Sequence, residues 1–205
     1  MKLTTEQVEM INSFLVKNEV VFDDVRHEII DHIACDVEQN YEGIPFNESI
    51  AIVLKKWERQ IQLSESSWVT TWASFPTIVL SKLKQRVIPQ VVFFTIGIII
   101  GLGLSHYFPE LKNIYSDYSV ILSWIYGIWF AAISILGIRL FFSRGFTTYK
   151  YLFKRNFYII YLTTIIITIP KTTDLFLLFF LLLNIFNSYF LLREYKAHFK
   201  FLKFN

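Results

Sequence analysis

The side chains best suited to chemistry are concentrated in one segment, residues 22–41. The apolar spacing of this segment predicts a helix, and residues four apart in a helix stack on one face. Imidazole, thiolate and carboxylate groups are suitable ligands for zinc and other divalent ions. One row contains His27, Asp31 and Cys35, and the adjoining row contains Asp24, Glu28, His32 and Asp36.

The candidate metal ligands are therefore His27, Asp31, His32, Cys35 and Asp36. One helix cannot close a coordination shell, so further ligands would have to come from another helix or subunit. A second interpretation is pH sensing by His27 or His32, because imidazole titrates near neutrality. The third is a solvated acidic face with His32 and Asp36 paired at the edge of a core. We expect the third, and hence no metal or cofactor.

No catalytic motif accompanies these residues. The chain lacks a serine-hydrolase elbow, HExxH, a phosphate loop, a glycine-rich dinucleotide loop and CxxC. We therefore expect that the protein is not an enzyme.

Four apolar windows without a charged residue predict a membrane domain. A bilayer core roughly 30 Å thick needs about 20 apolar residues in a helix, because lipid offers no partner to backbone groups. The third window is about 22 Å long as a helix. It spans only if Lys154 and Arg155 snorkel or the bilayer thins, and a re-entrant hairpin is the alternative. The windows cover residues 87–109, 118–138, 156–170 and 175–192.

The Lys and Arg residues around the windows predict their orientation. Twelve of them precede the first window, separate the second from the third, or follow the fourth, whereas the other two loops contain only Lys112 and Lys171. Positive charge is retained on the cytoplasmic side. We expect a multi-pass protein of the inner (cytoplasmic) membrane with both termini cytoplasmic. The polar start MKLTTEQ is unlike a signal peptide, and the single Cys35 fits a reducing compartment.

Polar and small residues inside the windows are candidates for contacts between helices. No Asp, Glu, Lys or Arg lies there, which argues against an ion-coupled transporter. Asn184 and Asn187 are the best candidates for an intersubunit or substrate contact, although packing between helices is the usual role of such residues. Gly97 and Gly101 form a GxxxG pair that permits close helix approach, so a second copy of the chain is a candidate partner.

The charge is divided sharply along the chain. Residues 1–66 carry 13 acidic and six basic side chains, whereas residues 67–205 carry four acidic and 14 basic ones. The basic residues flank the windows, where anionic headgroups attract them, so no nucleic-acid partner is implied. The acidic part can dock on the protein's own cytoplasmic loops or on a basic partner.

Residues 1–66 read as three amphipathic helices. The first begins after Thr4, which has capping-box spacing to Gln7. The second covers residues 22–41 and ends at Gly43-Ile44-Pro45, and the third starts with Asn47 as N-cap. The predicted core residues are Val8, Ile11, Phe14, Leu15, Phe22, Val25, Ile29, Ile33, Val37, Ile50, Val53, Leu54, Trp57 and Ile61.

The predicted fold is all-α, with a cytoplasmic three-helix headpiece followed by a four-helix transmembrane domain. The headpiece occupies residues 1–66 and an interfacial amphipathic connector residues 67–86. The transmembrane domain covers residues 87–192, and residues 193–205 form a basic cytoplasmic tail on the inner membrane surface.

The headpiece resembles a known family. The run Glu28-Ile29-Ile30-Asp31-His32-Ile33, then Glu38, then Gly43-Ile44-Pro45-Phe46 and Ser49-Ile50-Ala51, is similar to the HAAS-like or permease-prefix three-helix domain of small multispanning bacterial membrane proteins. The resemblance covers about residues 5–62. It departs from the family in the third helix, which continues through Lys55-Lys56-Trp57 instead of closing on an aliphatic-Gly turn. It implies a cytoplasmic regulatory or protein-interaction module without catalytic residues.

These patterns lead to one expected function and two alternatives. We expect an integral membrane protein that senses or signals by binding a protein partner through its headpiece, while its other helices lie in the bilayer. The first alternative is a transport or pore-forming subunit that oligomerises in the membrane. The second is a membrane enzyme that uses the His27–Asp36 cluster, which requires that cluster to face the membrane domain rather than water.

Overall fold

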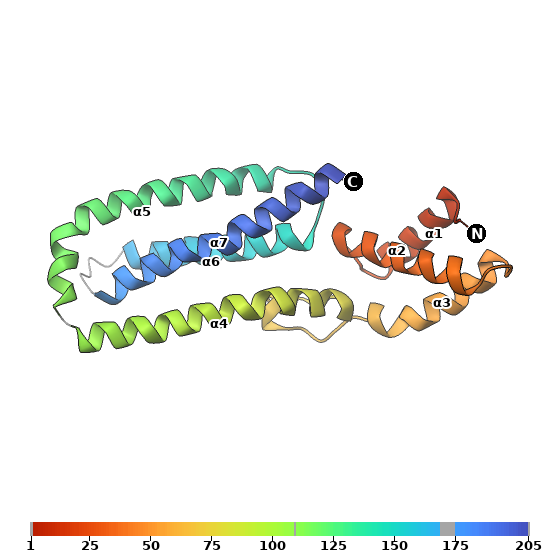
Figure 1. Cartoon of the computed structure of the whole chain (residues 1–205), viewed down its shortest axis with the longest axis horizontal. Helices are drawn as coiled ribbons and strands as arrows, with labels where there is room; N and C mark the ends of the chain where they lie inside the picture. The colour runs from red at the N-terminus through yellow and green to blue at the C-terminus, as the bar shows by residue number, and fades with distance from the viewer. Residues whose placement is uncertain (1, 109, 169–174, 205) are drawn as a thin grey trace. The chain divides into compact units, whose positions relative to one another are not determined.

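The structure, a computed structural model, describes residues 2–108, 110–168 and 175–204 (Figure 1). These residues form seven α-helices and no strand, which confirms the all-α prediction. The chain divides into two compact units. The headpiece unit comprises Met1–Arg86 together with Gly145–Thr148, and the second unit comprises Val87–Arg144 and Tyr149–Asn205.

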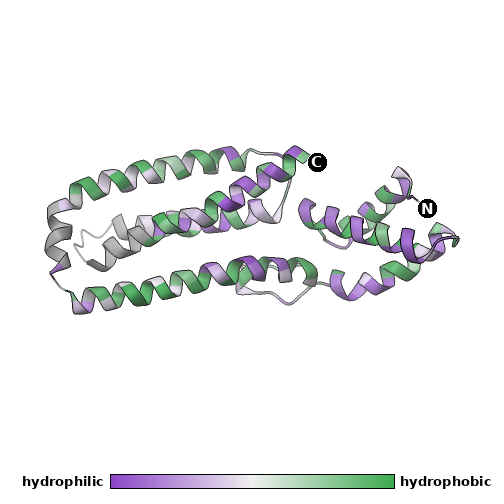
Figure 2. Cartoon of the chain, in the orientation of Figure 1, coloured by the Kyte–Doolittle hydropathy of each residue, from purple (hydrophilic) through white to green (hydrophobic). Residues whose placement is uncertain are grey.

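Three short helices form the body of the headpiece unit: α1 (Thr5–Lys17), α2 (Asp23–Asn40) and α3 (Phe46–Ile61). The Thr4 side chain accepts from the Gln7 backbone N–H, and the Gln7 side chain accepts from the Thr4 N–H. This reciprocal pair confirms the predicted capping box. In Figure 2 all three helices alternate between hydrophilic and hydrophobic residues, as amphipathic helices do.

The core of the headpiece contains most of the predicted residues. Every predicted core position of α2 is buried, and α1 and α3 each contribute only part of their predicted set. Val8, Phe14, Leu54 and Trp57 remain half-buried. The buried set is Ile11, Leu15, Phe22, Val25, Ile29, Ile33, Val37, Ile50, Val53 and Ile61.

The start of α3 differs from the prediction that Asn47 is its N-cap. The N-cap is Pro45, whose extended backbone at ψ 139° precedes helical Phe46. The Pro45 carbonyl accepts from the N–H groups of Glu48 and Ser49, so the first turn is closed by the backbone without a side-chain cap.

The segment between α3 and α4 folds back on the end of α3. The Ser64 N–H donates to the Phe75 carbonyl at 2.8 Å, and the Thr77 N–H donates to the Gln62 carbonyl at 3.0 Å. Within this segment, a short 3-10 turn covers Trp68–Thr70. The predicted connector, residues 67–86, is therefore a loop hydrogen-bonded to the end of α3, followed by the first turns of α4.

Four long helices follow: α4 (Thr77–Tyr107), α5 (Leu111–Phe141), α6 (Thr148–Thr168) and α7 (Leu175–Phe204). In the second unit α5 packs along α7. Residues of α7 beyond the fourth window continue as helix, and Tyr195 and Phe199 pack on the core. That core contains Ile133, Leu140, Phe153, Ile160 and Leu191.

Two helices are long and apolar enough to cross a membrane, over Thr77–Leu104 and Val120–Phe141. Figure 2 colours α4 and α5 hydrophobic along most of these stretches. The third and fourth predicted spans extend into residues 165–182, whose side chains lie outside the described part of the chain. Four spans therefore remain a prediction.

Candidate functional site

Two of the predicted metal ligands on α2 contact residues outside the predicted set. The His32 ring stacks on Trp57 with 6.2 Å between centroids. Asp36 pairs with Lys56 at 3.3 Å, and hydrogen bonds that the Lys56 ammonium donates to Tyr41 and Asp36 raise the pKa of Lys56. These contacts occupy the edge where α2 meets α3.

The remaining members of the predicted set form one exposed row along α2. This row contains His27, Asp31 and Cys35. In the described part of the chain, no three His, Cys, Asp or Glu side chains lie close enough to hold a metal ion. The acidic face of α2 stays a prediction, and Asp36 is paired with Lys56 rather than with His32.

The first turn of α2 binds the segment Gly145–Thr148, which joins the end of the connection after α5 to the first residue of α6. We refer to this segment as the α5–α6 loop. The Asp23 carboxylate accepts from the Phe146 N–H at 2.7 Å, while the Asp23 N–H donates to the Phe146 carbonyl at 2.8 Å. Asp24 accepts from both the N–H of Thr148, at 2.8 Å, and its hydroxyl. The Phe22 and Phe146 rings stack at 4.9 Å. The loop is thus part of the headpiece unit.

Other contacts in the headpiece unit join α2 to the start of α4. Glu28 of α2 forms an ion pair with Lys82 of α4. Just before these two helices, the ring centroids of Phe22 and Phe75 lie 5.2 Å apart. A cavity of about 310 Å³ opens on the same unit where α1 and α3 end, and Lys17, Glu58 and other residues line it. The headpiece therefore has a surface cavity lined by both acidic and basic side chains.

Polar side chains in the second unit hold α5, α6 and α7 together. The Tyr126 and Thr164 hydroxyls lie 2.6 Å apart, and the Trp129 indole N–H donates to Ser188 at 2.6 Å. The Asn184 amide N–H donates to Thr163 at 3.4 Å. Asn184 thus contacts a neighbouring helix of its own chain, and the side chain of Thr168 lies outside the described part. Such bonds stabilise helix packing where lipid offers no partner.

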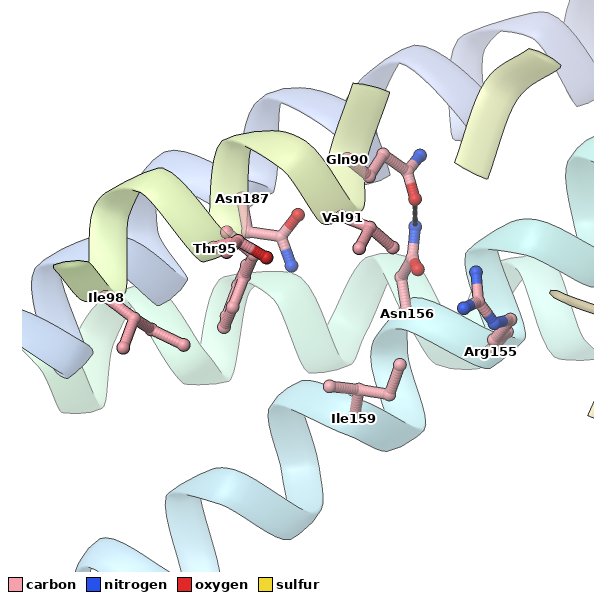
Figure 3. A pocket seen from close by; sticks show the side chains of 9 residues that line it. Gln90, Val91, Thr95, Ile98, Arg155, Asn156, Ile159 and Asn187 are labelled. Atoms are coloured by element: carbon pink, nitrogen blue, oxygen red, sulfur yellow. Dashed lines mark hydrogen bonds between the residues drawn. The ribbon is translucent and has the colours of Figure 1, made fainter. Parts of the chain in front are cut away.

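A pocket of about 240 Å³ lies between α4, α6 and α7 (Figure 3). Gln90 and Asn156 are both buried, and the Asn156 amide N–H donates to the Gln90 carbonyl oxygen at 2.9 Å. Arg155 and Asn187 also line the pocket. Its other lining residues are Val91, Phe94, Thr95, Ile98 and Ile159.

Ser143 and His198 lie close together at the end of α5, but the hydrogen bond between them does not run from serine to histidine, as it does for an activated serine nucleophile. Ser143 Oγ lies 2.7 Å from Nε2 of buried His198, but the Ser143 hydroxyl donates to the Leu140 carbonyl at 2.6 Å. A hydroxyl has one proton, so His198 Nε2–H is the donor to Ser143 Oγ. Lys150 donates to the Ser143 carbonyl, and burial and the nearby Lys154 charge lower the pKa of Lys150. The group caps the C-terminus of α5.

Gly97 contacts α7 of its own chain. A Cβ at this position would overlap the Leu183 side chain, so α4 and α7 approach closely there. Gly101 is buried on the same helix. The face that was a candidate for association with a second copy is therefore already used, at Gly97, within one chain.

Several buried polar residues were not identified from the sequence. Gln90 and Asn156 lie just inside apolar windows that were defined only by the absence of charge. Glu194 and His198 were assigned to a surface tail, yet they are buried, with 1% and 0% exposure. Their four-residue spacing behind Leu191 was the available signal, because it continues the inward face of α7.

The comparisons with known proteins identify no relative: no family model, curated protein or solved structure matches this chain.

Proposed function

We propose that this protein is an integral protein of the cytoplasmic membrane whose headpiece binds a protein partner and transmits that binding to the membrane helices. The headpiece would be a regulatory module, as its resemblance to the permease-prefix domain implies. Both termini would be cytoplasmic, and the protein would have no catalytic reaction of its own.

The attachment of the α5–α6 loop to α2 is the observation that carries the proposal. The chain passes between the two units at three points: after Arg86, after Arg144 and after Thr148. A module joined at one point can move as a tethered body. A module that also holds a loop between two later helices cannot change its packing without affecting those helices.

The exposed apolar surface supports the placement in a membrane. Trp124 and Ile128 of α5, together with Ile99 of α4, are each more than 60% exposed. Patches of this kind are rare on soluble proteins but normal against lipid. Trp72 is 72% exposed in the headpiece and Trp68 50%, and tryptophan is enriched at the membrane–water interface.

A proline close to the boundary between the two units supports the proposal that α4 transmits changes from the headpiece. Pro89 lies inside α4 shortly after Arg86, and it cannot donate to the carbonyl one turn earlier. Helices bend at such positions. A change in the headpiece can therefore reach α4 at Pro89 and α5 and α6 through the loop.

Site-specific photo-crosslinking in membranes tests the partner role. A photoreactive residue replaces Leu63, which lines the headpiece cavity and is 51% exposed. We expect a discrete adduct with another protein from this position. A matched probe at exposed Gln39, which does not line the cavity, is the control and should give a much weaker adduct. Absence of an adduct at Leu63, or an equally strong adduct at Gln39, would refute the proposal.

A transport or pore-forming subunit is the second candidate, and Asn187 favours it. This amide is buried but lines the pocket between α4, α6 and α7. Asn184, in contrast, is bonded to Thr163 within the chain. Flux measured in liposomes would fall in Asn187→Leu but not in Asn184→Leu if the pocket belonged to a pathway.

A further inference from the structure

The pocket between α4, α6 and α7 changes from polar to apolar along its length. Arg155 and the bonded amides of Gln90 and Asn156 lie toward one end, and Ile98 lies at the other (Figure 3). Gln90 and Ile98 are separated by about 12 Å along α4 at the rise of an α-helix. A ligand that fills the pocket must therefore be polar at one end and apolar at the other.

The polar end has a cation without an acidic partner in the described part of the chain, because Arg155 forms no ion pair there. Asn187, whose amide makes no hydrogen bond within that part, lies beside Thr95 between the two ends (Figure 3). A partly buried cation without a counterion is costly, so an anion is expected beside Arg155. A guanidinium fork matches the paired oxygens of a phosphate group.

The pocket as a whole is too small and too open to enclose a whole ligand. Its volume of about 240 Å³ is below the roughly 300–1,000 Å³ of sites that enclose a drug-sized molecule. Val91 and Ile159, which line the pocket, are 37% and 39% exposed, so it is open at its side. Most of the ligand must therefore lie outside the protein, against an apolar surface.

We propose that this pocket binds one anionic phospholipid, with its phosphate at Arg155 and part of one acyl chain beside Ile98. The inference rests on the membrane placement in the proposed function. Arg155 is the last charged residue before the third apolar window, which is the depth at which lipid phosphates lie. Basic pockets between membrane helices on the cytoplasmic side are suited to anionic headgroups.

Lipid binding by the full-length protein tests the proposal. The purified chain in detergent is titrated with dioleoyl phosphatidylglycerol or dioleoyl phosphatidylcholine, and bound lipid is counted by native mass spectrometry. We expect one tightly held phosphatidylglycerol. Arg155→Gln should weaken its binding about tenfold, the loss of one charge-assisted contact. Ile98→Trp, which fills the apolar end without altering charge, should also weaken it.

Arg144→Gln is the matched control, because Arg144 is exposed on the same stretch of chain but does not line the pocket. If Arg144→Gln and Arg155→Gln weakened phosphatidylglycerol binding equally, the lipid would be held by general surface charge, and the proposed site would be wrong. Unchanged binding in Arg155→Gln or in Ile98→Trp would also overturn it, as would full displacement of the lipid by millimolar inorganic phosphate.

Extraction of membranes with alkaline carbonate shows whether the lipid site alone is wrong or whether the proposed membrane placement is wrong as well. Release of the chain by carbonate would refute the membrane placement itself. Retention of the chain, together with identical lipid binding in all variants, would refute only the lipid site.

Discussion

Asp23 and Phe146 are joined by a reciprocal pair of hydrogen bonds, N–H to carboxylate at 2.7 Å and N–H to carbonyl at 2.8 Å. They are 123 residues apart in the sequence. The first turn of α2 thus binds one of the protein's own loops, at the backbone of Phe146 and Thr148 and at the Thr148 hydroxyl.

Removing the carboxylates of Asp23 and Asp24 should release the α5–α6 loop. Each charge-assisted hydrogen bond contributes roughly 1.5–3 kcal/mol, so amide exchange at Phe146 and Thr148 should accelerate at least about tenfold in Asp23→Ala, Asp24→Ala. Hydrogen exchange with mass spectrometry measures it. Asp31→Ala, at an exposed acidic position of the same helix, should leave the loop protected. Equal protection in both variants would contradict the docking.

Gly97 should tolerate no large side chain. Gly97→Ile forces Leu183 out of its position, and overpacking of this kind costs typically 1–3 kcal/mol. The melting temperature in detergent should fall accordingly. Gly103→Ile is the matched control, because a Cβ at Gly103 meets nothing within 4 Å. Adding Leu183→Ala should restore part of the loss in Gly97→Ile, and absence of rescue would argue against this contact.

Ser143 should be chemically inert despite its histidine neighbour. Its proton is donated to the Leu140 carbonyl, so His198 cannot act on it as a base. A fluorophosphonate probe should not label the protein. Ser143→Ala should lower stability by about 0.5–1.5 kcal/mol, the net contribution of one hydrogen bond. Labelling that disappears in Ser143→Ala would show that this assignment is wrong.

Lys150 should make the free energy of unfolding depend on pH in the alkaline range. Burial, with the Lys154 charge, lowers the pKa of Lys150 in the folded state below the ordinary value of 10.5. The unfolded chain then binds more protons between these two pKa values, so stability should rise with pH across that window. Melting curves recorded from neutral pH to about 10.5 measure the effect. The rise should be smaller in Lys150→Met, and an equal rise would exclude Lys150 as its source.

The local features of the fold could be predicted because they depend on neighbouring residues. The apolar spacing of α2 identified Val25, Ile29 and Ile33 as core residues, and the spacing of Thr4 and Gln7 identified the capping box. Each of these depends on helix geometry alone.

The long-range features could not be predicted in the same way. Asp23 and Asp24 lie in the first turn of α2, where the helix dipole favours acidic residues, and nothing near them in the chain indicates the α5–α6 loop. The pocket required three helices to bring Gln90, Asn156 and Asn187 together. No apolar pattern encodes which polar residues of separate helices meet.

Cys35 provides the most direct test of the membrane placement on which the account depends. It is the single cysteine of the chain and is exposed on the headpiece. A membrane-impermeant maleimide should label it in inside-out vesicles but not in intact cells. Glu110→Cys in a Cys35→Ala background should show the opposite pattern, because Glu110 lies in a loop predicted to face outward. Labelling of Cys35 in intact cells, or recovery of the chain in the soluble fraction, would contradict the account.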